Sequence, residues 1–600
     1  MVKAFAAEPW SGKHKIILGF DIGTTFSGVS YAYLFPDGPQ TVARVNAWPG
    51  QEAHKGESKI PTLLWYNKNK KATAFGAEAL TAETQDEAED NGWILARHFK
   101  LHLHPQTMKE KHNLTIDPLP EGVPLSTIYR DFFGYLIRHT QDAFTDRVLD
   151  GARVWKTYFP SADIVIAHPN GWGLREQEFM RRAAVAADVV PQSESHNRIF
   201  FVTEGEASVH YCMFHANLAP QFKPNVKFVV CDAGGSTVDT TAYSVSEVRP
   251  QLQLREVKPS ACIQAGGIFV NKAAEEYFHR VFSNPEANLP PDESRDFVKK
   301  AIDDFETTAK KAFKDITTKG SVDIGQTRYT NPAVGVKRGR MTLDGTTTKT
   351  FFQPFVKQIV DSLREQMSGI NCEHILLVGG FGENAFLRET LKKTFESKHC
   401  QVVTANDSTS KAVSDGVVIW HATTSVIARA CRFQYGSIAY VPYDSKNPRH
   451  SERSTFRGID GRENIDNVWH PIVKLGDVLQ PDEGVAEAFF RNYKTPSPDL
   501  GRITSVMFAY TLNGQKEPYY AKDSAGNLVS GIEDVCTISA DLSGLSGALE
   551  ERWGSEGRYW RLDYKIGIRF GGTELQAYLE WVEDGVTRTS QAQLIPNSLM

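Results

Sequence analysis

Two stretches of the chain share one local pattern, in which an apolar strand runs into an aspartate and a turn of glycine and hydroxyl residues follows. The first is residues 17–28, ILGFDIGTTFSG, and the second is residues 229–239, VVCDAGGSTVD. Each turn leads into another β-type stretch, so we predict β-hairpins at 16–33 and 227–245. Backbone N–H groups and hydroxyls in such turns can bind phosphate oxygens, and glycines let the main chain come close. Two such hairpins predict two related lobes that face each other across a nucleotide.

The bulk properties limit the classes of function. A length of 600 residues exceeds the size of one hydrophobic core, so several domains are expected. The net charge of -5 gives no reason to expect a nucleic-acid partner. No apolar run approaches the roughly 20 residues of a membrane span, so we expect no membrane partner. The seven cysteines include no CxxC pair, which indicates reduced thiols in a cytosolic or nuclear compartment, and we expect a cytoplasmic protein.

The order of predicted elements indicates four segments. Residues 1–15 lack the apolar core of a signal peptide, and we expect a short N-terminal tail. Strands and helices alternate over residues 16–422, which predicts an α/β domain, and residues 423–432 would be a linker. Short β-type runs and frequent turn residues then predict a β-rich C-terminal domain at 433–600.

Apolar periodicity predicts the main helices of the α/β domain. We expect a mainly helical stretch at 76–103 and β-structure at 321–352. Further helices are predicted at 126–149, 174–188, 204–214, 354–368 and 385–397, with a helical region between residue 268 and about residue 318.

A third element with glycines lies at residues 378–384, VGGFGEN, between a buried strand and a helix. Its glycines would let an adenosine or ribose lie against the backbone, although an ordinary tight turn is the alternative. An aspartate at the end of each hairpin strand can hold a magnesium ion, usually through water. Neither hairpin is a Walker loop, because GxxxxGK[ST] is absent and the first turn leads to a strand.

With these three elements in this order, residues 16–422 resemble the actin-like ATPase superfamily and, within it, the 70-kDa heat-shock protein family. Residues 21–27 and 232–239 resemble its two phosphate motifs, and residues 378–382 resemble its adenosine motif. Residues 203–207, TEGEA, and residues 412–416, AVSDG, resemble the first and second connecting motifs of the family. The Phe-Gly-Glu-Asn ending of the adenosine motif is most similar to the divergent twelfth-type branch. The resemblance implies a two-lobed actin-like ATPase domain of α/β class with a β-rich C-terminal domain.

The resemblance also implies a role for each matching residue. Asp21 and Asp232 would hold a hydrated magnesium ion, Thr237 would lie near the γ-phosphate and Glu204 would position the attacking water. The family lysine that contacts the transferred phosphate matches Lys100, with Arg97 as the alternative. The residues that would cradle the phosphates are Gly23, Thr24, Thr25, Gly234, Gly235, Ser236 and Thr237. Those that would lie near the ribose and adenine are Gly266, Gly267, Glu306, Lys310, Gly379, Gly380 and Gly382.

Ordinary structural roles are alternatives for several of these residues. Glu204 could cap a helix N-terminus, where a carboxylate is favoured. Glu306 and Lys310 could be a surface ion pair at i,i+4, and Lys100 could be a solvated charge. The histidines at 98, 102, 104 and 112 lack the cysteine or carboxylate spacing of a metal site, so we expect solvated or core histidines.

The chain departs from the family pattern at three places. Ser236 replaces the third glycine of Gly-Gly-Gly-Thr but can still donate a hydrogen bond. Glu383 stands where the family usually has an arginine that stacks on adenine, which weakens the expected base sandwich. Residues 423–432 lack the acidic, leucine-rich linker that couples nucleotide state to substrate release.

The leading interpretation is an ATP-binding, heat-shock-like chaperone that slowly hydrolyses ATP to ADP and phosphate, with Mg-ATP between two lobes. Lobe closure would be transmitted to the β-rich domain, and client protein segments and co-chaperones would be partners. One alternative is a nucleotide-binding scaffold without useful turnover. Another is a small-molecule kinase of the same superfamily, for which no catalytic base is evident. Residues 433–600 would be either a reduced peptide-binding β-sandwich or an unrelated packing domain.

Overall fold

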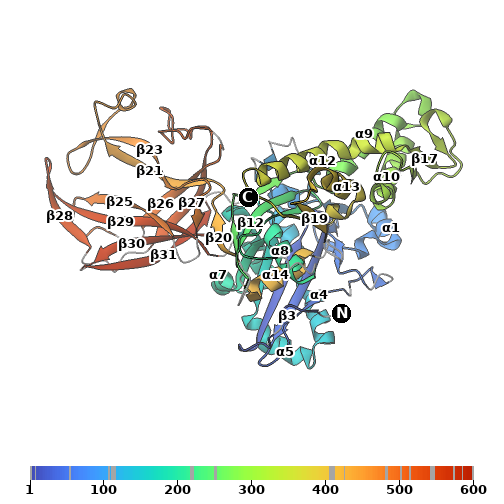
Figure 1. The fold of residues 1–600 in the computed structure, drawn as a ribbon, viewed down its shortest axis with the longest axis horizontal. Coiled ribbons are helices and arrows are strands. Elements are labelled where there is room, and N and C mark those ends of the chain that lie inside the picture. Colours follow the sequence, from blue (N-terminus) through green and yellow to red (C-terminus); the bar gives the residue numbers. More distant parts are fainter. Residues whose placement is uncertain are drawn as a thin grey trace. The chain divides into compact units, whose positions relative to one another are not determined.

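A computed structural model describes most of the chain as two compact units (Figure 1). The first unit comprises Met1–Trp172, Met180–Gln253 and Ser260–Ser425, and the second comprises Gly173–Phe179, Leu254–Pro259 and Val426–Met600. The described residues are 3–6, 8–46, 48–52, 56–105, 108–109, 116–215, 222–248, 253–404, 412–423, 426–479, 484–499, 503–512, 515–540, 548–571, 574–583 and 585–596.

The first sheet of the first unit is built on the first predicted hairpin. Strands β2 (Lys15–Ile22) and β3 (Phe26–Leu34) pair antiparallel, with Asp21 opposite Gly28. The other strands of this sheet are β9 (Asp163–His168), parallel to β2; β10 (Ile199–Thr203), parallel to β9; β4 (Thr41–Arg44) and β5 (Lys59–Pro61), both on β3; and β1 (Lys3–Ala4), on β4. The hairpin predicted at 16–33 is therefore confirmed.

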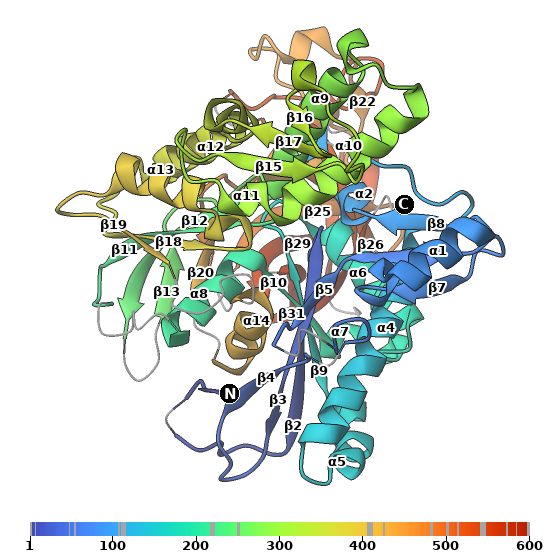
Figure 2. The ribbon, with the colours of Figure 1, turned by 90° about the vertical axis from the view of Figure 1, so that its right-hand side faces the viewer.

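A second sheet repeats this arrangement around the second predicted hairpin. Strands β11 (Lys227–Ala233) and β12 (Val238–Glu247) pair antiparallel, with Asp232 opposite Asp239. Other strands of this sheet include β18 (His374–Val378), parallel to β11; β19 (Gln401–Thr404), parallel to β18; and β14 (Ala261–Ile263), on the start of β12. The orders β3-β2-β9-β10 and β12-β11-β18-β19 match, and Figure 2 shows these two groups of strands.

Two helices that follow corresponding strands pack against each other in the first unit. Helix α8 (Glu204–His215) follows β10, and α14 (Ala412–Thr423) follows β19. A Cβ atom added to Gly416 would lie 1.8 Å from the Ala207 carbonyl oxygen, so the two helices approach at backbone distance. Apolar side chains of α14 and of strands β2, β9 and β10 form one buried cluster with Ala207. The first hairpin and both helices therefore share one packed core.

The remaining helices of the first unit include those predicted from periodicity. The expected helices at 126–149, 174–188, 204–214 and 385–397 are confirmed as α4 (Leu125–Arg147), α6 (Leu174–Ala186, with residues in both units), α8 and α13 (Ala385–Phe395). The others are α1 (Ala82–Asn91), α2 (Lys100–Leu103), α5 (Gly151–Tyr158), α7 (Ser195–Arg198), α9 (Gly267–Phe282), α10 (Pro291–Thr307), α11 (Ala309–Ala312) and α12 (Gly345–Met367). Among the described residues, no helix combines the length and apolar character that a membrane span requires.

The prediction of a mainly helical stretch at 76–103 is wrong in part. Helix α1 ends at Asn91 and is capped by Gly92, whose φ of +63° is a left-handed conformation that glycine adopts without strain. Residues Ile94–Arg97 then form strand β8, which pairs with β6 (Leu63–Tyr66); β7 (Ala72–Phe75) completes this small sheet. A run as short as Ile94–Arg97 is too short for its apolar spacing to distinguish a helix from a strand, so the pairing with β6 decides its conformation.

The prediction of β-structure over 321–352 is also wrong at its C-terminal end. Strands β15 (Gly320–Asp323), β16 (Val336–Lys337) and β17 (Arg340–Leu343) do form a small sheet. Helix α12, however, begins at Gly345 and includes Pro354, which the sequence suggested as its start. The Asp344 carboxylate caps the helix by accepting a hydrogen bond from the Thr347 N–H at 2.8 Å.

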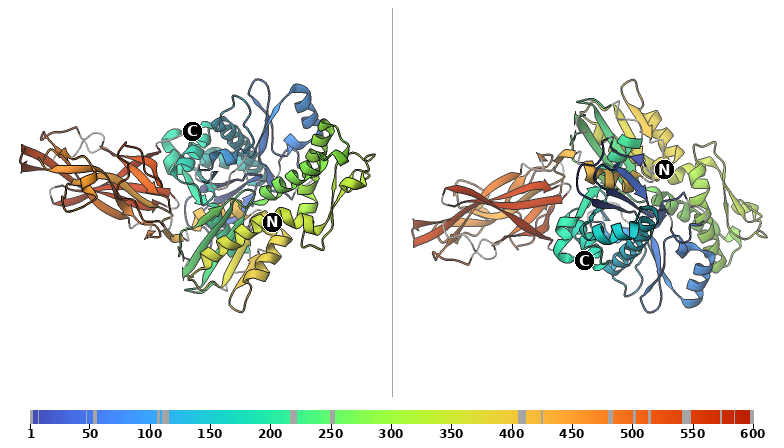
Figure 3. Two further views of the ribbon diagram at one scale, coloured as in Figure 1. Left: turned by 90° about the horizontal axis from the view of Figure 1, so that it is seen from above. Right: turned by 90° about the horizontal axis from the view of Figure 1, so that it is seen from below.

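The second unit is β-rich, as expected for the C-terminal part of the chain (Figure 3). Its main sheet has the order β22-β23-β21-β26-β27-β31-β30-β29-β25, with β28 on β29. These strands are β21 (Gln434–Pro442), β22 (Phe456–Arg457), β23 (Glu463–Val473), β25 (Val485–Tyr493), β26 (Ile503–Tyr510), β27 (Ile532–Ala540), β28 (Leu549–Gly554), β29 (Gly557–Gly571), β30 (Glu574–Glu583) and β31 (Val586–Pro596). Alternate residues of β30 are buried, which gives the sheet one face toward a core.

The segment expected as a linker, 423–432, contains strand β20 (Val426–Ala430) of the second unit. Strand β20 pairs with β13 (Gln253–Glu256) and β24 (Val478–Leu479). Residues 424 and 425 lie outside the described residues.

Candidate functional site

The turns of the two hairpins meet, although they are more than 200 residues apart in the sequence. The Oγ1 of Thr24 and the Oγ of Ser236 lie 2.7 Å apart in a buried hydrogen bond. A Cβ atom added to Gly235 would lie 2.6 Å from Thr25 Oγ1, so only glycine allows this approach. A Cβ atom on Gly23 would lie 2.3 Å from the Phe26 carbonyl oxygen, which explains the glycine in the first turn. The structure thus brings both predicted phosphate turns into one place.

The predicted Gly266-Gly267 pair lies on the second hairpin turn. The Gly266 N–H donates to the Ser236 carbonyl oxygen at 2.9 Å, and the Ile268 N–H donates to the Gly235 carbonyl oxygen at 2.9 Å. A Cβ atom on Gly266 would lie 2.5 Å from the Gly235 carbonyl oxygen. Helix α9 therefore begins directly on this turn, whose carbonyl oxygens accept its first N–H groups.

Buried carboxylates gather beside the two turns. Asp232 accepts a hydrogen bond from Ser208 Oγ at 2.7 Å, and the Asp239 carboxylate accepts one from the Asn170 N–H at 3.0 Å. Burial and the charge of Glu204 raise the pKa of Asp232 to about 7, with a further contribution from Asp21. Burial and the charge of Glu204 also raise the pKa of Asp239 well above its usual value. Carboxylates whose pKa values are raised by burial and by one another favour a bound proton or cation.

Lys100 and Glu204, both predicted from the family pattern, form an ion pair. Lys100 Nζ lies 2.6 Å from Glu204 Oε1, and the two side chains are 3% and 11% exposed. The ammonium also lies 5.4 Å from the ring centroid of Trp172. Arg97, the alternative to Lys100, is 54% exposed and pairs instead with Asp117. The structure therefore places Lys100 in the carboxylate cluster and excludes a solvated position for it.

The glycines of the predicted adenosine motif lie against the second hairpin to different extents. Gly379 has a φ of +83°, and a Cβ atom on it would lie 2.4 Å from Asp232 Oδ1 and from the Ala233 carbonyl oxygen. Gly382 is buried against Leu377, whereas Gly380 is exposed. Gly379 is thus the member of the motif that touches the acidic cluster.

Glu306 and Lys310 occupy unequal environments. Their charged atoms are 3.9 Å apart, and the Glu306 side chain is 45% exposed whereas that of Lys310 is 13% exposed. A Cβ atom on Gly267 would lie 3.2 Å from Lys310 Nζ, so the ammonium sits at the start of α9. Burial lowers the pKa of Lys310 from 10.5 to about 8. The Lys310 ammonium is therefore largely buried beside Gly267, and it is not simply one partner of a surface ion pair.

Four side chains of the cluster were not among the predicted site residues. Asp239 stands opposite Asp232 in the hairpin register, and Ser208 follows Glu204 by one helical turn, so both could have been found from spacing. No sequence spacing pointed to Asn170 or Lys59. Asn170 follows β9 and Lys59 lies on β5, so only the tertiary structure brings them to the cluster. Lys59 Nζ lies 2.6 Å from Asp21 Oδ2.

The four histidines noted in the sequence have different surroundings. The Nδ1 of His98 lies 3.1 Å from the Asp117 carboxylate, and the His102 ring donates to the Asp117 carbonyl oxygen. The His104 ring accepts a hydrogen bond from Trp172 Nε1 and is fully buried. His112 lies outside the described residues.

The carboxylates of Asp21 and Asp232 are the hard oxygen donors that a magnesium ion takes, usually with water retained between ion and protein. Within the part of the chain that the structure describes, no three His, Cys, Asp or Glu side chains are grouped to bind a metal ion directly. The two carboxylates would suit a hydrated magnesium ion, which at Asp21 would meet the Lys59 ammonium, 2.6 Å from Asp21 Oδ2.

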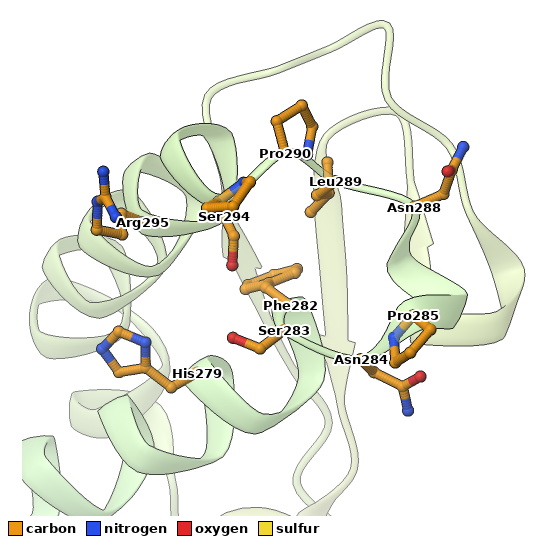
Figure 4. A pocket seen from close by; sticks show the side chains of 11 residues that line it. His279, Phe282, Ser283, Asn284, Pro285, Asn288, Leu289, Pro290, Ser294 and Arg295 are labelled. Carbon is orange, nitrogen blue, oxygen red and sulfur yellow. The ribbon is translucent and has the colours of Figure 1, made fainter.

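A separate cavity of about 620 Å³ lies between the end of α9, the 3-10 helix Pro285–Ala287 and the start of α10 (Figure 4). Its walls include His279, Phe282, Ser294 and Arg295. None of the residues that line it belongs to the hairpin turns or to the predicted site.

In comparison with known proteins, the chain is similar over most of its length to 70-kDa heat shock proteins. It is 22% identical to human heat shock 70 kDa protein 12B, over 95% of this chain and 89% of that protein. It is 20% identical to human heat shock 70 kDa protein 12A and 21% identical to the mouse protein of that name, each over 94% of this chain and 89% of the relative. No family model matches the chain. The predicted resemblance to the twelfth-type branch is confirmed by these relatives.

Proposed function

We propose that this protein binds Mg-ATP between two lobes of an actin-like domain, residues 16–422, and slowly hydrolyses it as a heat-shock-like chaperone. The observation that carries the proposal is the Thr24–Ser236 contact, which joins two phosphate-type hairpins at the ends of sheets with matching strand order. Residues 1–15 would be a tail, 423–432 the connection and 433–600 the β-rich domain.

In this proposal the turns cradle the phosphates. Backbone N–H groups and hydroxyls of Gly23–Thr25 and Gly234–Thr237 bind phosphate oxygens, with the start of α9 at Gly267 beside them. Glu306, Lys310 and the backbone of Gly379–Gly382 lie along the ribose and adenine.

Hydrolysis in this proposal depends on positioning and charge, as phosphoryl transfer requires. Asp21 and Asp232 would hold magnesium through water, and the bound ion would neutralise charge on the phosphates. Lys100, fixed by Glu204, directs its ammonium toward the transferred phosphoryl group, where negative charge develops. Glu204 also orients the attacking water.

The proposal is tested by titrating ATP into the full-length protein by calorimetry, followed by single-turnover measurement of phosphate release. Binding followed by slow release supports it, and absence of ATP binding overturns it. Tight binding without release, and without an effect of unfolded peptides, would favour the scaffold. ATP consumption that requires an added sugar would favour the kinase.

Asp232→Asn separates binding from hydrolysis. The asparagine oxygen can still accept the hydrogen bond from Ser208, but the charge that would hold the hydrated ion is lost. We expect the single-turnover rate to fall by about 100-fold, much more than the affinity for ATP. Asp117→Asn, at the exposed partner of Arg97, is the control and should leave both quantities unchanged. Equal hydrolysis by Asp232→Asn and the parent protein would contradict the assignment.

Lys310 predicts a pH dependence of nucleotide affinity. Its lowered pKa of about 8 means that the free protein carries this charge below pH 8 and loses it above. A bound polyanion favours the charged form, so we expect ATP affinity to fall by up to about tenfold per pH unit above 8. Calorimetry from pH 7 to pH 9 measures this fall, which Lys310→Gln should abolish. Lys311→Gln, at the exposed neighbour, should retain the parent profile.

The chaperone part of the proposal rests on the relatives and on the presence of a β-rich unit. Client protein segments and co-chaperones are its proposed partners, and the free state of all seven cysteines supports the cytoplasm as its location. ATP-dependent suppression of the aggregation of a denatured client protein would test it, and aggregation that the protein leaves unchanged would count against it.

A further inference from the structure

Lys59 belongs to a row of three residues on adjacent strands. Asp21 on β2 is opposite Gly28 on β3, and Gly28 is opposite Lys59 on β5. The register therefore places the lysine two strands away from the aspartate on the same level of the sheet. This distance exceeds the reach of a short side chain but suits the four-carbon stem of lysine.

Gly28 opens the path between the two charged residues. A Cβ atom on Gly28 would lie 3.2 Å from Lys59 Cγ and 3.7 Å from Lys59 Cε, so the lysine stem runs over the glycine. Its ammonium ends 2.6 Å from Asp21 Oδ2, in an ion pair whose side chains are 18% and 4% exposed. The Gln51 side chain donates to the Lys59 carbonyl oxygen at 2.9 Å and holds the backbone of β5 at this point.

We propose that Lys59 is a built-in cation of the phosphate site, which supplies at Asp21 the positive charge that a magnesium ion would otherwise bring. The inference rests on the proposed nucleotide function and concerns which positive charge at that site neutralises the Asp21 carboxylate. A hydrated magnesium ion must displace the ammonium from Asp21 or share the carboxylate with it. An ammonium that already neutralises Asp21 removes the repulsion between this carboxylate and the incoming phosphates. Nucleotide binding by this protein therefore depends only weakly on magnesium.

The decisive quantity is the ratio of ATP affinities with excess magnesium chloride and with EDTA, measured by calorimetry on the full-length protein. For the parent protein we expect the two affinities to agree within about tenfold. For Lys59→Met we expect the affinity in EDTA to fall by about 10-fold to 100-fold, while the affinity with magnesium falls less. Lys59→Arg keeps the charge and should restore a ratio close to that of the parent.

Lys15→Met is the matched control, because Lys15 lies on the same hairpin and pairs with Asp163 at 2.5 Å, at the opposite end of β2. Its affinity ratio should equal that of the parent protein. A role of Lys59 in folding alone would lower both affinities together and leave the ratio unchanged, and that outcome would overturn the inference.

A second measurement avoids nucleotide altogether. Magnesium chloride alone is titrated into the nucleotide-free parent protein and into Lys59→Met, and we expect tighter magnesium binding by the variant because Asp21 is released. Equal magnesium binding by the two proteins, or ATP binding by the parent only with magnesium, overturns the inference but leaves the nucleotide site intact. Absence of ATP binding under both conditions overturns the proposed function, and this inference with it.

Discussion

Lys100→Met is expected to lower the single-turnover rate of ATP hydrolysis by about 100-fold to 1000-fold, the usual loss when a positioned group that stabilises the transition state is removed. The ammonium is buried and is held 2.6 Å from Glu204, where a cation from solvent has little access. Methionine fills a similar volume against Trp172 but carries no charge. Phosphate release from a preformed ATP complex measures the effect directly.

Two further variants make this prediction specific. Arg97→Ala removes the alternative residue, which is exposed and paired with Asp117, and should change the rate by less than about twofold. Lys100→Met alone leaves the Glu204 carboxylate buried without its partner, which costs about 3–5 kcal/mol of stability. The double variant Lys100→Met/Glu204→Gln should recover stability but not hydrolysis. A parent-like rate in a folded Lys100→Met protein would contradict the role of the lysine.

Gly416→Ala is expected to destabilise the first unit by about 3 kcal/mol or more, at the upper end of the usual cost of overpacking. The new methyl group would lie 1.8 Å from the Ala207 carbonyl oxygen and 2.5 Å from its carbon, so helices α8 and α14 must separate. Both contacts are with backbone atoms, which cannot move away by a change of rotamer. Thermal and denaturant unfolding, followed by near-ultraviolet circular dichroism, measures the loss.

Gly134→Ala is the matched control, because Gly134 also lies inside a helix. The nearest atom to its added Cβ is a guanidinium nitrogen of Arg138 at 3.5 Å, an ordinary contact with a flexible side chain. Here the gain in helix propensity should stabilise the protein by about 0.5–1 kcal/mol. Equal effects of the two substitutions would show that α8 and α14 do not pack at backbone distance.

Much of the candidate site could be predicted because its signals are local. A strand, an aspartate and a turn of small residues form a hairpin through neighbouring residues alone, and this pattern identified Asp21 and Asp232. The apolar period of α4 likewise depends on residues three and four apart. Strand β8 and the start of α12 were missed, because pairing with β6 and capping by Asp344 outweighed the local signals at Ile94–Arg97 and Pro354.

The sequence by itself determined that two phosphate-type hairpins exist and that the chain resembles 70-kDa heat shock proteins. Only the tertiary structure decided which charged side chains lie beside the turns of these hairpins. It selected Lys100 over Arg97, buried Lys310 and brought Lys59 across Gly28 to Asp21. The physical reason is that burial and strand register join residues that are distant in the chain. The energy of a charge depends on those neighbours and on its distance from water, which no local pattern of residues records.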